Sequence, residues 1–186
     1  MSEAALKNAS ASKAAAVAAK LGQRSIVLVG MMGAGKSSIG RRLATELGLR
    51  FVDADTEIEA AAGMTIPEIF ATHSEPAFRA LETRLLPRAL EPGAVVALGG
   101  GTLIDDDNWR LVDVKANTVY LEVPFETMWQ RIQARPGRPL ASGRSRHEVL
   151  ALFEWRRPRY EQATHRVDGD RPVELVADEV IKLWSD

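Results

Sequence analysis

Residues 30–37, GMMGAGKS, constrain the fold of this chain more than any other stretch. They match the pattern G-x-x-x-x-G-K-[S/T] in full, between an apolar β-branched run at 25–30 and apolar residues at helical spacing over 36–47. A strand, a glycine-rich turn and a helix in this order form a phosphate loop, whose backbone N–H groups and helix N-terminus hold nucleotide phosphates. The pattern predicts a nucleoside triphosphate site with these contacts: Gly33, Ala34, Gly35, Lys36, Ser37 and Ser38.

Within the pattern, two side chains carry most of the expected chemistry. The lysine of such a loop reaches the β- and γ-phosphates, and the hydroxyl of the serine ligates Mg²⁺. We therefore expect Lys36 to act in catalysis and Ser37 to hold the metal ion.

Strand-like and helix-like segments alternate along the rest of the chain. Further strands are expected from residue 51 and at 94–98, 118–123 and 165–168, and further helices at 65–71, 75–91, 126–134, 147–163 and 172–184, with a short helix around Trp109. Pro87 should end or kink the helix in which it lies. This alternation predicts parallel βαβ units and an α/β sheet with helices on both faces, in one domain over 25–186.

Composition excludes several classes of protein. The net charge of −1 argues against a dedicated nucleic-acid binder, which would be strongly basic. The absence of cysteine excludes disulfides and thiolate metal sites, and it suits a protein that folds in the reducing cytoplasm. No apolar run is long enough to cross a bilayer.

Residues 1–24 differ from the rest, because they are rich in Ala, Ser and Lys and hold few large aliphatic side chains. They lack the apolar centre of a secretory signal, and a transit peptide would contain more arginine. We expect a flexible amino-terminal tail, since little apolar burial is available to offset the entropy of ordering.

Two carboxylates follow the second expected strand in the sequence FVDAD. If the strand geometry persists, Asp53 and Asp55 share a face and lie beside the phosphate loop at the carboxyl edge of the sheet. One would hold Mg²⁺, and the other would hydrogen-bond a substrate hydroxyl and help to take its proton. The alternative is that Asp55 caps a helix that starts at Thr56.

Three further features bear on ligand and anion contacts. Arg79 and Glu82 share a helix face, either as an organised pair or as an ordinary surface ion pair. Gly99, Gly100 and Gly101 follow a strand and allow a ligand to approach the backbone. Residues 131–166 contain nine arginines and three acids. A loop at 134–146 with Arg138 could close over the γ-phosphate and exclude water.

Several motifs, taken in order, resemble the shikimate kinase family over about residues 25–184: GMMGAGKSSIGRRLA, DAD, FRALE, LGGG, RPL and the Arg-x-x-x-Tyr of RRPRY. The resemblance implies a nucleoside-monophosphate-kinase-like fold, a P-loop three-layer sandwich with a five-stranded parallel sheet and a mobile lid at about 134–146. It implies a cytoplasmic, monomeric enzyme that transfers the γ-phosphate of ATP to the 3-hydroxyl of shikimate, with Mg²⁺.

The resemblance also assigns roles to matching residues. Ser37 and Asp53 correspond to the Mg²⁺ site, and Asp55 to the aspartate that contacts the shikimate hydroxyls. Arg79 and Arg156 correspond to the pair that binds the shikimate carboxylate, with Glu82 orienting Arg79 and with Gly99, Gly100 and Gly101 on the substrate side. Arg138 corresponds to the lid arginine, Arg131 to the adenine-stacking arginine, and Arg171 with Pro172 to the second adenine wall.

Some positions depart from the family pattern. Ser38 replaces the commoner threonine, Ala141 follows RPL where leucine is usual, and Arg135 competes with Arg131 for the adenine. Two other functions stay open at this point. One is a kinase for another hydroxy acid, such as gluconate. The other is a nucleotide-dependent binding module, which would leave Asp55 without a purpose.

Overall fold

The computed structural model describes residues 14–134 and 145–185. Its centre is a parallel sheet with the strand order β2-β3-β1-β4-β5. The strands are β1 (Ser25–Val29), β2 (Arg50–Asp53), β3 (Ala94–Ala97), β4 (Ala116–Glu122) and β5 (His165–Asp168). All five residues of β1 are buried, because this strand lies in the middle of the sheet and is covered on both faces. The predicted five-stranded parallel sheet is confirmed.

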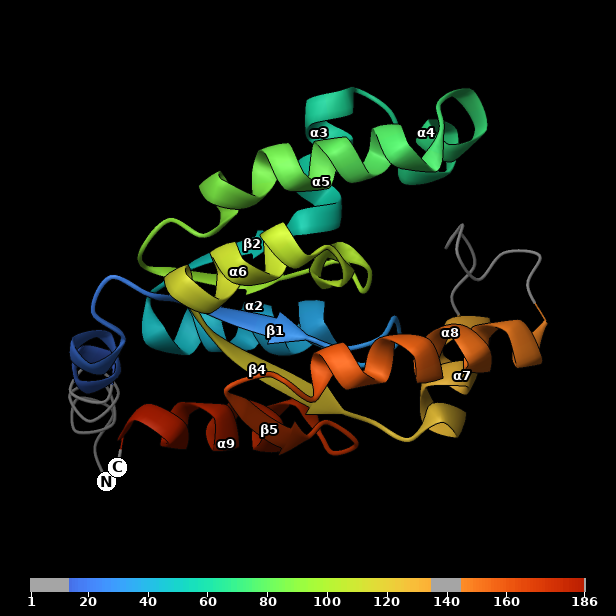
Figure 1. Ribbon diagram of the computed structural model, residues 1–186. Helices are drawn as coiled ribbons and strands as arrows, with labels where there is room; N and C mark the ends of the chain where they lie inside the picture. Colours follow the sequence, from blue (N-terminus) through green and yellow to red (C-terminus); the bar gives the residue numbers. More distant parts are fainter. Residues whose placement is uncertain (1–13, 135–144, 186) are drawn as a thin grey trace.

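Helices connect the strands and cover both faces of the sheet. They are α2 (Lys36–Leu47), α3 (Ala54–Ala62), α4 (Ile66–Thr72), α5 (Glu75–Ala89), α6 (Asp106–Lys115), α7 (Phe125–Gln133), α8 (Arg146–Tyr160) and α9 (Val173–Ser185), with a 3₁₀ turn η1 (Thr102–Ile104). In Figure 1, α2 lies behind the sheet, while α6 and α8 lie in front of it. None of the helices in the described part of the chain is long and apolar enough to cross a membrane.

Most element boundaries agree with the sequence pattern. Helix α5 and the amino-terminal segment differ, as does the junction of β2 and α3, which is described with the site. Helix α5 continues through Pro87 and ends two residues later at Ala89, so this proline lies in the last turn. Residues 14–21 are helical, with Val17 and Leu21 buried in the main core. This part of the expected tail is therefore packed, because Val17 and Leu21 are four residues apart and share one helix face. Residues 1–13 lie outside the described residues.

Three helices form a separate group beyond β2. Helices α3, α4 and α5 contact one another and enclose a small apolar cluster of Ile58, Ile69 and Phe78. Figure 1 shows this group above the sheet, on the side of β2 and away from β5. The carboxyl ends of β1, β2 and β3 lead into the phosphate loop, α3 and the glycines 99–101, which brings these three segments to one edge of the sheet.

Candidate active site

A cavity of about 440 Å³ lies at this edge of the sheet. Most site residues predicted from the sequence line it. Pro172 is not among the lining residues, and Arg138 lies outside the described residues together with most of the expected lid. The lining includes Gly33, Ala34, Gly35, Lys36, Ser37, Ser38, Asp53, Asp55, Arg79, Glu82, Gly99, Gly100, Gly101, Arg131, Arg156 and Arg171. Residues that lie far apart in the sequence, from Gly33 to Arg171, therefore meet in this cavity.

The phosphate loop, residues 30–37, has the geometry needed to receive an anion. Gly33 has a φ of 83°, and a Cβ there would lie 2.8 Å from the carbonyl oxygen of Met128, so only glycine fits. No side chain caps the first turn of α2, which leaves its N–H groups available to phosphate oxygens. Lys36 Nζ donates to the carbonyl oxygens of Gly30 at 2.7 Å and Met31 at 3.0 Å, which holds its charge at the loop.

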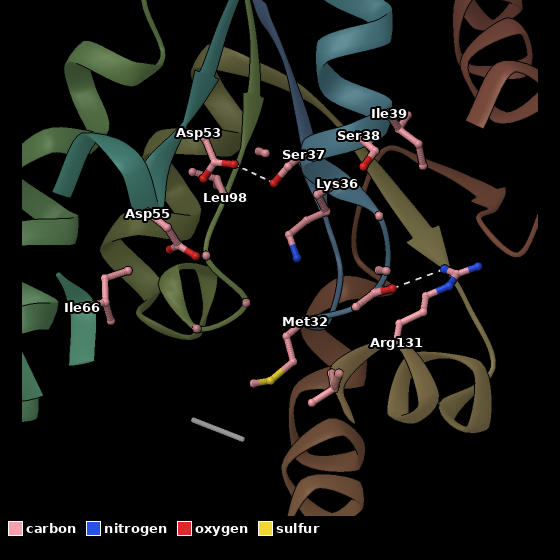
Figure 2. Close-up of a pocket in the computed structure, with 18 of the residues that line it drawn as sticks. Met32, Lys36, Ser37, Ser38, Ile39, Asp53, Asp55, Ile66, Leu98 and Arg131 are labelled. Atoms are coloured by element: carbon pink, nitrogen blue, oxygen red, sulfur yellow. Dashed lines mark hydrogen bonds between the residues drawn. The ribbon is translucent and has the colours of Figure 1, made fainter. Parts of the chain in front are cut away.

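A pair of oxygen ligands lies beside the loop. Ser37 Oγ donates to Asp53 Oδ2 at 2.6 Å, as the dashed line in Figure 2 marks. Within the described residues, no group of three or more His, Cys, Asp or Glu side chains could hold a metal ion. Two protein oxygens fit Mg²⁺ well, because this ion usually keeps several waters and binds through one or two protein oxygens plus substrate phosphates.

The two aspartates are not arranged as the strand pattern predicted. Strand β2 ends at Asp53, and Asp55 lies in the first turn of α3. The alternative that Asp55 caps the helix is also wrong, because Asp53 occupies the N-cap position. Figure 2 shows both carboxylates on one side of the cavity, across from Lys36. They still meet at the site because the chain turns into the helix directly at the sheet edge.

The carboxylate of Asp55 lies close to the glycines that follow β3. A Cβ at Gly99 would lie 3.2 Å from Asp55 Oδ1 and 2.9 Å from Glu82 Oε1. A side chain at position 99 would therefore crowd both carboxylates. Glycine, which has no side chain, lets the backbone pass close to them.

Arg79 is held by acidic partners on its own helix. Its Nη1 donates to Glu82 Oε2 at 2.5 Å and its Nη2 to Glu75 Oε1 at 3.0 Å. Glu82 is buried, and its second oxygen accepts from Thr102 Oγ1 at 2.6 Å. Burial alone would lower the pKa of Arg79, but the two carboxylates outweigh it and raise that pKa. The predicted pairing of Arg79 with Glu82 is confirmed, and it is a part-buried, organised contact rather than a surface ion pair.

Arg156 differs from Arg79 because its charge is not balanced by a direct contact. It is 3% exposed, and its Nε and Nη1 have no hydrogen-bond partner among the described residues. Burial lowers the pKa of this guanidinium, and the positive charge of Arg79 lowers it further. A buried cation with unsatisfied donors, next to a cavity, has the charge and the hydrogen-bond donors that suit an anion.

The two arginines meet at the last glycine of the turn. A Cβ at Gly101 would lie 2.6 Å from Arg79 Nη1 and 3.0 Å from Arg156 Nη2. Both guanidinium groups therefore lie against the same glycine, and an acceptor carboxylate placed there would meet two cations.

The expected adenine residues lie on the opposite side of the phosphate loop. Arg131 Nη1 donates to the carbonyl oxygen of Gly33 at 3.2 Å (Figure 2). Its Nη2 donates to Asp170 Oδ1 at 3.1 Å. Arg171 pairs with Glu179 and with Asp168. Both line the cavity. The competing Arg135 lies outside the described residues.

Sequence reasoning missed an apolar wall of the cavity and several supporting contacts. Met32, Ile66, Pro67, Phe70 and Phe78 line the cavity, with the rings of the two phenylalanines 4.9 Å apart. Ile66 and Phe70 are four residues apart on one helix, a spacing that could have indicated their common face. The contact of Thr102 with Glu82 joins residues 20 positions apart in the chain, and no local pattern indicates it.

Comparisons with known proteins agree with this geometry. The family model "Shikimate kinase" matches residues 32–184. A shikimate kinase of Caulobacter vibrioides is 48% identical over 166 residues, which cover 88% of this chain and 82% of that protein. The solved structure "Shikimate kinase from Acinetobacter baumannii in complex with shikimate" superimposes with a TM-score of 0.84 at 33% identity, covering 90% of this chain and 96% of that one.

A gluconokinase from Sinorhizobium meliloti aligns less well, with a TM-score of 0.53 at 24% identity over 86% of this chain and 90% of the other. That likeness shows the shared fold alone. The comparisons therefore favour a shikimate kinase over a gluconate kinase. With the family match over most of the chain, the phosphate loop and the paired arginines in one cavity, this chain belongs to the shikimate kinase family.

Proposed function

We propose that this chain transfers the γ-phosphoryl group of ATP to the 3-hydroxyl of shikimate, giving shikimate 3-phosphate and ADP. The single observation that carries the proposal is the buried guanidinium of Arg156, which lies with unsatisfied donors beside Arg79 in the cavity that also holds the phosphate loop. A nucleotide and a small carboxylate can therefore bind in the same cavity. Membership of the shikimate kinase family supports shikimate as that carboxylate.

On the acceptor side, we assign the carboxylate of shikimate to Arg79 and Arg156, and its hydroxyls to Asp55 and the glycines 99–101. Glu82 orients Arg79 through their direct hydrogen bond. Guanidinium groups suit a carboxylate because each can donate two parallel hydrogen bonds to it. The apolar wall of Ile66 and Phe70 would pack against the carbon ring and exclude water from it.

On the phosphate side, the transfer needs positioning and charge stabilisation more than covalent chemistry by the protein. The acceptor oxygen attacks the γ-phosphorus, and the bond from this phosphorus to the β–γ bridging oxygen breaks, with ADP as the leaving group. Asp55 takes the proton of the acceptor hydroxyl. Lys36, now bonded to the carbonyls of Gly30 and Met31, would exchange these partners for the β- and γ-phosphate oxygens.

We propose that Ser37 and Asp53 hold Mg²⁺, Ser37 directly and Asp53 through water. When bound, this ion would neutralise negative charge on the phosphate groups. We further propose that Arg131 and Arg171 with Pro172 flank the adenine, that Arg138 closes over the γ-phosphate, and that the enzyme acts as a monomer.

The experiment that tests the proposal is coupled ADP release with and without shikimate, with gluconate and quinate as matched hydroxy-acid acceptors. Shikimate should raise the rate of ADP release at least about 100-fold over the acceptor-free rate, and chelation of divalent ions should abolish it. The phosphorylated product is identified by ³¹P NMR. Faster turnover of gluconate than of shikimate, or ADP release that no acceptor stimulates, would overturn the assignment.

A further inference from the structure

Tyr160 lies behind the acceptor site, and none of the roles assigned above involves it. Its ring is 1% exposed, and its hydroxyl donates to the carbonyl oxygen of Gly100 at 2.5 Å. Burial raises the pKa of Tyr160 to about 12, which means that the hydroxyl keeps its proton and stays a donor at neutral pH. The contact joins residues that are 60 positions apart in the chain, from the end of α8 to the glycines that follow β3.

The same hydroxyl lies next to two other parts of the site. A Cβ on Gly100 would lie 3.2 Å from the Tyr160 hydroxyl, 3.4 Å from Arg156 Nη1 and 3.5 Å from the carbonyl oxygen of Gly30. Tyr160 follows Arg156 by one helical turn, so both side chains project from the same face of α8. The hydroxyl also lies 3.9 Å from the sulfur of Met31, in the phosphate loop. Helix α8, the glycine turn and the phosphate loop thus converge on this one hydroxyl.

The hydrogen bond fixes the orientation of the peptide that joins Gly100 and Gly101. The peptide is trans, so its carbonyl and its N–H point in opposite directions. Because the carbonyl of Gly100 points to Tyr160, the N–H of Gly101 points away from it. In the described part of the chain, neither Gly100 nor Gly101 donates its N–H to a backbone carbonyl, and both residues line the cavity. These N–H groups are therefore available to an acceptor.

Glycine offers this peptide no side chain that would restrict its rotation. Residues 99–101 are all glycine, the residue type with the most backbone freedom. Ordering a glycine costs more conformational entropy than ordering any other residue type, so this turn is costly to order. A donor on the Gly100 carbonyl restrains the turn before substrate binds. Without the donor, the peptide could flip and present a carbonyl oxygen where the acceptor needs an N–H group.

We propose that Tyr160 is a positioning residue for the acceptor, which acts through the Gly100–Gly101 peptide and through Arg156. The inference rests on the proposed function, because it assigns Tyr160 to the site at which shikimate binds. Tyr160 touches neither substrate nor nucleotide in this assignment. Its removal should weaken the binding of the acceptor and leave the binding of ATP unchanged.

The test is Tyr160→Phe, which removes only the hydroxyl and keeps the ring that packs on Tyr120, 5.7 Å away between ring centroids. The KM for shikimate should rise about tenfold, while the KM for ATP stays within about twofold, since the lost bond orients the acceptor side alone. Tyr120→Phe is the matched control, because Tyr120 is about as buried, whereas the hydroxyl that donates to the Gly100 carbonyl is that of Tyr160. This control should keep both KM values within about twofold of wild type.

The outcomes separate this inference from the proposed function. If wild type and Tyr120→Phe do not phosphorylate shikimate, the proposed function fails. If they do, and Tyr160→Phe has an unchanged KM for shikimate, the positioning role alone fails. A lower melting temperature with a lower kcat and unchanged KM values would likewise overturn it, because that result describes a merely structural tyrosine.

A second measurement keeps the inference testable if Tyr160→Phe does not fold. The chain has two tyrosines, so Tyr120→Phe leaves Tyr160 as the single site of ¹³Cζ-tyrosine labelling. Saturation with shikimate should move this resonance by more than its line width, and ADP alone should not. A resonance that shikimate leaves in place would overturn the proposal.

Discussion

Replacing Arg156 with methionine should stabilise the substrate-free protein and at the same time remove most of its affinity for shikimate. The guanidinium is 3% exposed, and two of its nitrogens lack a partner among the described residues. A buried charge that is not compensated costs several kcal/mol after relaxation, and replacing buried charges with apolar side chains of similar size is often stabilising. Arg156→Met keeps most of the volume and removes the charge.

The two effects can be estimated separately. A net gain of about 1–2 kcal/mol in the free energy of unfolding corresponds to a rise of about 2–8 °C in the melting temperature for a chain of this length. In the complex, two charge-assisted hydrogen bonds to the shikimate carboxylate are lost, at about 1.5–3 kcal/mol each. Since about 1.4 kcal/mol is a factor of ten, the KM for shikimate should rise at least about 100-fold.

The assay is thermal unfolding by circular dichroism, with and without shikimate, in a buffer free of chloride, phosphate and sulfate. Small anions must be absent because they would bind beside Arg156 and hide its cost. At about 100 times its Kd, shikimate should stabilise wild type by about 2.7 kcal/mol, and this shift should be lost in Arg156→Met. Coupled ADP release gives the KM values.

The control is Arg157→Met, on the same helix. Arg157 is about half exposed and pairs with Glu154 at 3.0 Å and Glu161 at 3.7 Å, so its replacement should change stability by no more than about 0.5 kcal/mol. A melting temperature of substrate-free Arg156→Met that falls below wild type, with an unchanged control, would refute the reasoning. It would mean that the charge of Arg156 is already well stabilised.

Three further predictions concern the acceptor side. Asp55→Ala should lower kcat at least about 100-fold and leave ATP affinity, measured by calorimetry, within about twofold, because the role proposed for Asp55 is at the acceptor hydroxyls; normal turnover would remove it from the site. Arg79→Ala should raise the KM for shikimate about 10–100-fold, since the carboxylate loses a charged donor and Glu82 loses its cationic partner; an unaltered KM would show that the carboxylate binds elsewhere. Thr102→Val should destabilise the fold by about 1–3 kcal/mol in urea unfolding, because one buried oxygen of Glu82 loses its donor. The control Thr45→Val removes an exposed hydroxyl on α2 and should destabilise the fold much less. Equal losses in the two threonine variants would count against the network.

Local and periodic features of the fold could be predicted from the sequence. The phosphate loop needs a strand before it and a helix after it, and both patterns are visible over 25–47. The pairing of Arg79 with Glu82 could be predicted for the same reason, because it depends only on helical spacing. These features are set by neighbours within one turn or one strand.

The position of Asp55 shows where local reasoning fails. The side-chain period of a strand placed Asp53 and Asp55 on one face, but the strand ends at Asp53. The following residues, ADTEIEAAA, contain good helix formers, and Gly63 ends the helix in the left-handed conformation. The prediction that both carboxylates line the site was correct, although its geometric reason was wrong. Long-range contacts, such as Tyr160 with Gly100, depend on the packed fold and leave no periodic signal in the sequence.

In the proposed assignment, the charges of Arg79 and Arg156 would make the site favour an anionic acceptor. The charge of Arg79 is balanced by Glu82 and Glu75, so this guanidinium is held in place before substrate arrives. The charge of Arg156 has no such balance among the described residues, and burial prevents water from supplying it. A neutral acceptor would leave this cation buried and unpaired, whereas a carboxylate supplies the missing charge and the missing hydrogen-bond acceptors together. Binding of a carboxylate would therefore relieve the electrostatic cost of keeping Arg156 buried, and this relief would contribute to the binding free energy of the acceptor.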